Sequence, residues 1–200
     1  GGMGQDITTY TGSNYLYIHG GRIAVEAGGD GIDANGAIVM TDGTVIVNGP
    51  TENMNGALDY DGGFAISGGF FVAAGSAGMA QAPDQSSSQN SVLINFSATL
   101  PAGTLVHIQN SAGEEVLTFA PTKQFQSIAF SSPALVNGET YTVYTGGSSS
   151  GALQDSLYTS GTYSPGDQYT TFTIASVVTL VGASGFGGGL PGRPGRPGQP

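Results

Sequence analysis

Residues 18–25 (IHGGRIAV) recur as residues 40–47 (MTDGTVIV) and again as residues 66–73 (ISGGFFVA), with steps of 22 and 26 residues. Each copy holds two short runs of alternating polarity that meet at a glycine, a pattern typical of two β-strands joined at a corner. One copy cannot bury its apolar side alone, whereas stacked copies bury a shared core. The repeat therefore predicts a β-solenoid.

A second motif completes each copy, because residues 32–36 (IDANG) align with residues 58–62 (LDYDG) and give each coil a third strand. Side chains alternate across a strand, so the pattern also predicts which positions face the core. The predicted inward residues are Leu16, Ile18, Ile38, Met40, Phe64 and Ile66 in the first wall, Ile23, Val25, Val45, Val47, Phe71 and Ala73 in the second, and Ile32, Ala34, Leu58 and Tyr60 in the third. Gly21, Gly43 and Gly69 share one column, which predicts a corner with positive φ.

Several stretches carry a resemblance to a known family. They are residues 29–36 (GDGIDANG), 55–62 (NGALDYDG), 75–83 (GSAGMAQAP), 90–96 (NSVLINF), 103–107 (GTLVH), 117–121 (LTFAP) and 141–147 (YTVYTGG). The chain resembles bacterial cell-surface carbohydrate-binding-domain proteins built on a right-handed parallel β-helix, which look like polysaccharide lyases without catalytic machinery. The resemblance implies a non-catalytic, carbohydrate-binding protein. Members of that family usually carry more coils upstream, so the chain is also expected to be the C-terminal part of a longer precursor.

The chain divides into four predicted segments, all of them β-structured or irregular. A lead-in or partial coil (1–13) precedes a short right-handed parallel β-helix (14–89), and a Gly-rich hinge with a collagen-like Gly-X-Pro tail (183–200) ends the chain. Between them, residues 90–182 hold short apolar runs separated by turn signals, which predicts an antiparallel, sandwich-like β domain. That domain would also cover the strand edge at the end of the solenoid.

Composition limits the partners and the location. The net charge is −10 with only four Lys and Arg residues, so the chain lacks the basic clusters that nucleic acids and anionic membranes require. No stretch is long and apolar enough to insert into a membrane. An acidic chain that is rich in Gly, Ser and Thr and poor in Lys is typical of an exported protein, so we expect an extracellular or cell-surface location.

An acidic ladder predicts a metal site. Asp33 and Asp59 occupy the same outward column in adjacent coils, and stacked strands lie about 4.8 Å apart. Carboxylates at that spacing repel unless a cation bridges them, and Asp and Asn oxygens are the hard ligands that Ca²⁺ prefers. Asn35, Asp61 and Asp30 are the further candidate ligands. The alternative is a solvated polar face on which the pKa of a carboxylate is raised.

Exposed aromatic side chains are the sequence feature that favours sugar binding. Tyr15, Tyr17 and Phe70 are predicted to face outward on the solenoid, and flat aromatic faces are what sugars stack on. No nucleophile, base and pocket converge in the sequence, so we expect the chain not to be an enzyme. The chain's single lysine, Lys123, and its Asn-Gly pairs leave open a minor alternative, an isopeptide bond.

The tail from Gly189 to Pro200 consists of Gly-X-Pro triplets, which favour polyproline II backbone. We expect it to contact a neighbouring chain, and the alternative is a free extended tail. The candidate assembly residues are Arg193, Arg196, Pro191, Pro194 and Pro197.

Two functions from different classes remain open. One is a Ca²⁺-dependent module that binds polysaccharides, including acidic polysaccharides. The other is a structural subunit of an extracellular filament, a homo-oligomer that assembles head to tail through its solenoid ends and its tail.

Overall fold

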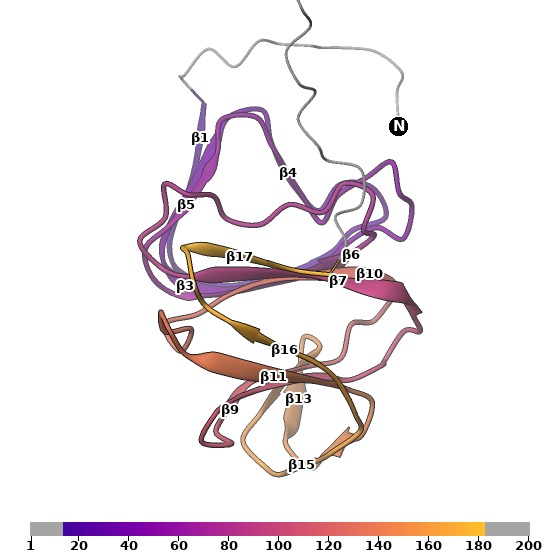
Figure 1. Ribbon diagram of the computed structural model, residues 1–200. Coiled ribbons are helices and arrows are strands. Elements are labelled where there is room, and N and C mark those ends of the chain that lie inside the picture. Colours follow the sequence, from indigo (N-terminus) through magenta and orange to yellow (C-terminus); the bar gives the residue numbers. More distant parts are fainter. Residues whose placement is uncertain (1–13, 183–200) are drawn as a thin grey trace, which may run out of the picture.

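The computed structural model describes residues 14–182, which form strands and turns with no helix (Figure 1). The predicted lead-in (1–13) and the hinge and Gly-X-Pro tail (183–200) lie outside the described residues, as do the five assembly residues. The all-β prediction is confirmed. Since the described residues contain no helix, none of them forms a helix that could cross a membrane.

Two large sheets and two small pairs make up the fold. The seven-stranded sheet has the order β1 (Tyr15–Glu26), β3 (Ala37–Asn48), β6 (Phe70–Gly75), β10 (Phe125–Ser131), β7 (Ser91–Leu100) and β17 (Val178–Val181), with β5 (Phe64–Ile66) also paired to β3. The six-stranded sheet has the order β13 (Ala152–Gln154), β14 (Leu157–Thr159), β9 (Glu115–Phe119), β8 (Val106–Asn110), β11 (Thr140–Thr145) and β16 (Asp167–Thr173). The small pairs are β2 (Ile32–Ala34) with β4 (Leu58–Tyr60), and β12 (Ser148–Ser149) with β15 (Tyr163–Ser164).

The three copies of the repeat lie side by side as parallel strands, in the register that the sequence predicts. Ile18 pairs with Met40 and Met40 with Ile66, while Val45 pairs with Phe71. The corner glycines have positive φ, and a Cβ on Gly43 would lie 2.8 Å from the backbone of Gly20. The predicted break at the corner separates β5 from β6, whereas β1 and β3 each continue through it as one 12-residue strand with a register shift in their pairing.

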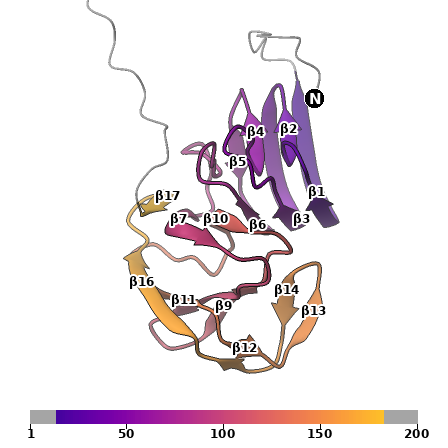
Figure 2. The same cartoon turned by 90° about the vertical axis from the view of Figure 1, so that its right-hand side faces the viewer.

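The second half of the chain continues this sheet. β10 pairs antiparallel with β6, β7 pairs antiparallel with β10, and β17 pairs parallel with β7. The hydrogen-bonding edge of β6 is therefore occupied by β10. Figure 2 shows β6, the last of the parallel strands, beside β10 and β7, with the six-stranded sheet below them. The boundary predicted after residue 89 thus falls between strands of a single sheet.

Both faces of the central strands are buried. One face packs under β2 and β4 through the predicted inward set, for example Val45, Val47 and Phe71. The other face packs on the six-stranded sheet through Ile46 and Val72, which the alternating pattern predicted to face outward. That prediction was wrong for these two side chains, because the second sheet covers the face that a solenoid alone would leave in water.

In the edge strand β1 the burial differs from the prediction in the opposite direction. Leu16 and Ile23, both predicted inward, are 37% and 38% exposed, whereas Ile18 is buried as predicted. β1 pairs only with β3, so no described strand lies over its other edge. The apolar side chains of an edge strand stay partly in water because they have neighbours on one side only.

Two isoleucine truncations test this arrangement. Ile46→Ala should lower the free energy of unfolding by about 2–5 kcal/mol, because it leaves a cavity in a fully packed layer. Ile23→Ala should cost less than about 1 kcal/mol, since the side chain is already partly in water. Urea unfolding of both variants measures the difference. Equal costs, or a larger cost at Ile23, would contradict the two-sided burial of the sheet.

Candidate functional site

Three ring side chains form a row on the edge strand β1. The rings of Tyr15 and Tyr17 stack with centroids 5.4 Å apart, and those of Tyr17 and His19 with centroids 5.7 Å apart. Tyr15 is 48% exposed and Tyr17 is 56% exposed, so both face solvent as predicted. The His19 ring is held by a hydrogen bond of 2.8 Å between its Nδ1 and Thr41 Oγ1 on β3. The row is therefore an ordered aromatic ridge on the surface.

Small side chains lie beside this ridge. Tyr15 pairs with Ala37, and Tyr17 pairs with Val39, which in turn pairs with Ala65. Side chains of paired residues point to the same face of a sheet. The ridge is thus bordered by a shelf of short apolar side chains, on which an extended ligand would meet little steric obstruction.

A cavity of about 250 Å³ opens next to Tyr15, where the first wall meets the third. Its lining residues are Asn14, Tyr15, Leu16, Asp33, Ala34, Asn35, Gly36 and Ala37. Gly36 allows the two segments to approach, because a Cβ there would lie 2.3 Å from the Asn14 carbonyl oxygen. One aromatic ring and two of the predicted metal ligands, Asp33 and Asn35, therefore share a single pocket.

The acidic ladder has the predicted register. Asp33 on β2 pairs with Asp59 on β4. Partial burial raises the pKa of the Asp59 carboxyl, and the neighbouring carboxylates of Asp30, Asp33 and Asp61 raise it further. Asp30 has a structural contact, since its Oδ1 accepts a hydrogen bond of 2.8 Å from the Gly56 amide. Like charges thus accumulate along the third wall.

Calcium binding at the third wall stays a prediction. Between residues 14 and 182 no three His, Cys, Asp or Glu side chains converge closely enough to hold a metal ion on their own. β2 and β4 end at Ala34 and Tyr60, so Asn35 and Asp61 lie just beyond the paired residues. A calcium ion at this wall would therefore need the Asn35 amide, backbone carbonyls or oxygens of a ligand in addition to the carboxylates.

Phe70 lies apart from the other two predicted ligand-binding residues. Its ring packs edge-on against Phe130, with centroids 5.3 Å apart, and it borders the core between the two large sheets. The second sheet covers this part of the second wall, so Phe70 is partly buried. It does not join Tyr15 and Tyr17 in one surface.

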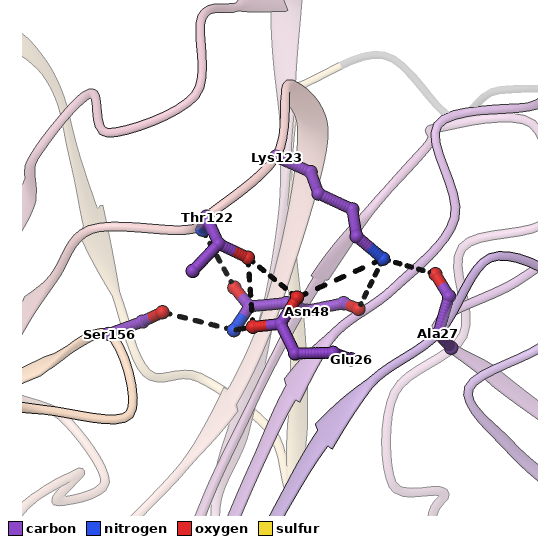
Figure 3. Close-up of polar contacts among 6 residues, drawn as sticks. All are labelled: Glu26, Ala27, Asn48, Thr122, Lys123 and Ser156. Atoms are coloured by element: carbon purple, nitrogen blue, oxygen red, sulfur yellow. Dashed lines mark hydrogen bonds and ion pairs between the residues drawn. The ribbon is translucent and has the colours of Figure 1, made fainter.

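Sequence reasoning missed a polar cluster where the second wall meets the loop between β9 and β10 (Figure 3). The buried Asn48 side chain donates to Glu26 Oε1 at 2.6 Å and to Ser156 Oγ at 3.0 Å, and it accepts from the Thr122 amide at 3.1 Å. Lys123 donates to the carbonyl of Ala27 and, at 3.3 Å, to that of Asn48. The only sequence signals were the single lysine and the Asn48-Gly49 pair, since the contacts join positions far apart in the chain.

Comparison of the chain with protein-family models, curated proteins and solved structures finds no match. The resemblance to carbohydrate-binding β-helix proteins therefore stays a prediction, and the functional argument depends on the geometry above.

When calcium is absent, replacing one carboxylate of the ladder should stabilise the protein. Because the pKa of Asp59 is raised in the folded chain, folding favours the protonated form of this carboxyl. The stability that the protonated form contributes is lost as the pH rises through that pKa. Asp59→Asn should therefore raise the free energy of unfolding at pH 7 by on the order of 1 kcal/mol, or the melting temperature by about 2–4 °C.

Thermal unfolding at pH 7 and pH 3 in chelator measures this effect, with Asp167→Asn, an exposed residue of β16, as the control. The gain should vanish at pH 3, where the wild-type carboxyl is protonated. Destabilisation by Asp59→Asn at pH 7 would contradict the assignment of repulsion to the ladder.

Proposed function

We propose that the protein is a non-catalytic carbohydrate-binding module of the cell surface or extracellular matrix. The observation that carries this proposal is the pocket where Tyr15 lies with Asp33 and Asn35, at the end of the exposed ridge of Tyr15, Tyr17 and His19. A sugar offers an apolar face to an aromatic ring and hydroxyl groups to carboxylate and amide side chains, and this pocket supplies both kinds of partner.

The charge of the chain favours a bridging cation. A net charge of −10 repels an acidic polysaccharide, and Asp33 adds to the local negative potential. Ca²⁺ held by Asp33, the Asn35 amide and oxygens of the sugar would reverse this repulsion, with Asp59 as the next carboxylate along the wall. The proposal assigns no catalytic residue.

We further propose that residues 14–89 are a short right-handed parallel β-helix. Its support is the parallel register of β1, β3, β5 and β6, together with the parallel pair β2 and β4 at the third-wall positions. The right hand follows from the crossover rule for parallel strands. The pocket then lies at a corner between two walls, where side chains from different strands meet.

Affinity measurements on polysaccharides test the module. The protein should be retained on at least one of immobilised polygalacturonate, xylan and cellulose, and Tyr15→Ala should weaken that retention about tenfold, or about 1.4 kcal/mol. Tyr158→Ala, a partly exposed tyrosine on β14 in the other sheet, is the matched control and should leave binding unchanged.

A chelator arm tests the cation in the same experiment. Binding to polygalacturonate should fall when calcium is removed and return when it is added, and Asp33→Asn should reduce the response. The carbohydrate proposal fails if no polysaccharide is retained, or if Tyr15→Ala and Tyr158→Ala behave alike.

A filament subunit is the second candidate, favoured by the two outer strands of the seven-stranded sheet. β10 already pairs with β6 at the far edge of the parallel stack, so a strand of another copy cannot pair with β6 there. β1 and β17 each pair on one side only within the described residues, and both carry exposed apolar side chains, Ile23 and Leu180. Pairing of β1 in one copy with β17 in the next would join unlike edges and give an open polymer.

The Gly-X-Pro tail, with Arg193 and Arg196, is proposed to contact an acidic surface of the neighbour.

Electron microscopy of the purified protein tests this candidate. Filaments should be visible for the wild type and lost on Leu180→Lys, because a charge on an edge strand opposes pairing. Val136→Lys changes an exposed residue outside the strands and should leave them intact. Monomers alone in the wild type would end this proposal.

A further inference from the structure

The polar cluster at Asn48 contains the three groups of an amide-exchange reaction. Lys123, the chain's single lysine, supplies an amine. Asn48 supplies a carboxamide, and its residue is only 3% exposed. Glu26 supplies a carboxylate that touches both, with Oε1 accepting from Asn48 Nδ2 at 2.6 Å and Oε2 lying 3.9 Å from Lys123 Nζ. Figure 3 shows the Glu26 carboxylate between the Asn48 carboxamide and Lys123 Nζ, which points to the main-chain carbonyls of Ala27 and Asn48.

The orientation of the Asn48 amide is fixed by its partners. The Thr122 amide can only donate, so the atom that it meets at 3.1 Å is Oδ1. The Glu26 carboxylate accepts from Nδ2, as does Ser156 Oγ. The carbonyl is thus polarised by a backbone N–H, and the nitrogen that would leave is already hydrogen-bonded to an acid–base group.

We propose that Lys123 and Asn48 are a modification site, at which an intramolecular isopeptide bond forms with Glu26 as the proton carrier. Glu26 takes a proton from the Lys123 ammonium, and the neutral Nζ attacks Cγ of Asn48. The Thr122 N–H stabilises the negative charge on Oδ1 in the tetrahedral intermediate. Glu26 then passes this proton to Nδ2 and takes up the second proton that Nζ must lose. The Cγ–Nδ2 bond breaks, and the released ammonia carries that second proton away as ammonium. The new bond is Nζ–Cγ, and no electron is gained or lost.

The reaction needs a short movement of one side chain. Nζ already donates to the main-chain carbonyl of Asn48 at 3.3 Å, and the carboxamide belongs to the same residue. Rotation about the four-carbon stem of Lys123, whose side chain is 31% exposed, carries the amine toward Cγ. Holding both partners in one hydrogen-bonded cluster replaces an intermolecular encounter by an intramolecular one.

The bond would supply a covalent cross-link in a chain that has no cysteine to form a disulfide. It would join the end of β3 to the loop between β9 and β10, and so link the parallel strands covalently to the strands that cover them. A cross-link between distant positions restricts the unfolded chain much as a disulfide does.

Mass spectrometry tests the proposal directly. The intact wild-type protein should be lighter than its sequence by one ammonia. Cleavage after glutamate should release one branched peptide in which residues 27–52 and 116–139 are joined through Asn48 and Lys123. This readout on the wild type does not depend on whether any variant folds.

Three variants separate this reaction from its nearest competitor. Asn48 precedes Gly49, and such a pair can lose ammonia by closing a succinimide on its own backbone. Lys123→Arg keeps Asn48-Gly49 and a positive charge, and should have the full mass, as should Glu26→Gln and Asn48→Ala. A full-mass wild type, or a loss of ammonia that persists in Lys123→Arg without the branched peptide, would overturn the proposal.

Discussion

Burial of the seven-stranded sheet on both faces is the constraint from which the rest of the structure follows. One face packs against the third-wall strands and the other against the six-stranded sheet. Val45 and Ile46 are consecutive residues of β3, and both are fully buried, one on each side. A parallel strand that is covered twice needs apolar residues at successive positions. β3 and β6 therefore belong to both cores, and neither half of the chain completes its core without the other.

The same constraint explains which parts of the fold the sequence predicts. The parallel register follows from the repeat, because like residues in successive copies must pair if the glycine corner is to be shared. The short apolar runs predicted between residues 90 and 182 also coincide with strands, for example residues 92–96 with β7 and residues 141–144 with β11. The second core was missed although its signal was present. Residues 45–47 (VIV) and 71–74 (FVAA) are uninterrupted apolar runs, which indicate burial on both faces rather than alternation.

The candidate site was predictable in its parts but not in its assembly. Outward placement of Tyr15, and the pairing of Asp33 with Asp59, follow from strand alternation and from the repeat. The pocket of Tyr15 and Asp33 depends on how two walls meet at Gly36, which strand periodicity does not specify. The cluster of Glu26, Asn48 and Lys123 depends on the packing of the second sheet, and no local pattern encodes that contact.

The two sheets are joined by a strained hairpin at the C-terminal half of β1. Asp155 and Ser156 form the turn between β13 and β14 with φ of 49° and 69°, a left-handed geometry that costs on the order of 1 kcal/mol for each non-glycine residue. Glycine would fit this turn better, but it has no side chain. Asp155 Oδ2 accepts from Arg22 Nε at 2.7 Å, and Ser156 Oγ accepts from Asn48.

The side chains of this turn therefore offset its strain by holding the adjoining strands. A partly exposed ion pair such as that of Arg22 with Asp155 contributes at most about 1 kcal/mol, so the buried bond to Asn48 is needed as well. These contacts, with those of Glu26, restrain β1 only beyond its glycine corner. Before the corner, the strand that carries Tyr15 and Tyr17 packs on β3 and on the segment from Asp33 to Gly36. The face proposed to bind sugar is therefore free of the second sheet, and substitutions there can change binding without disturbing the joint between the two sheets.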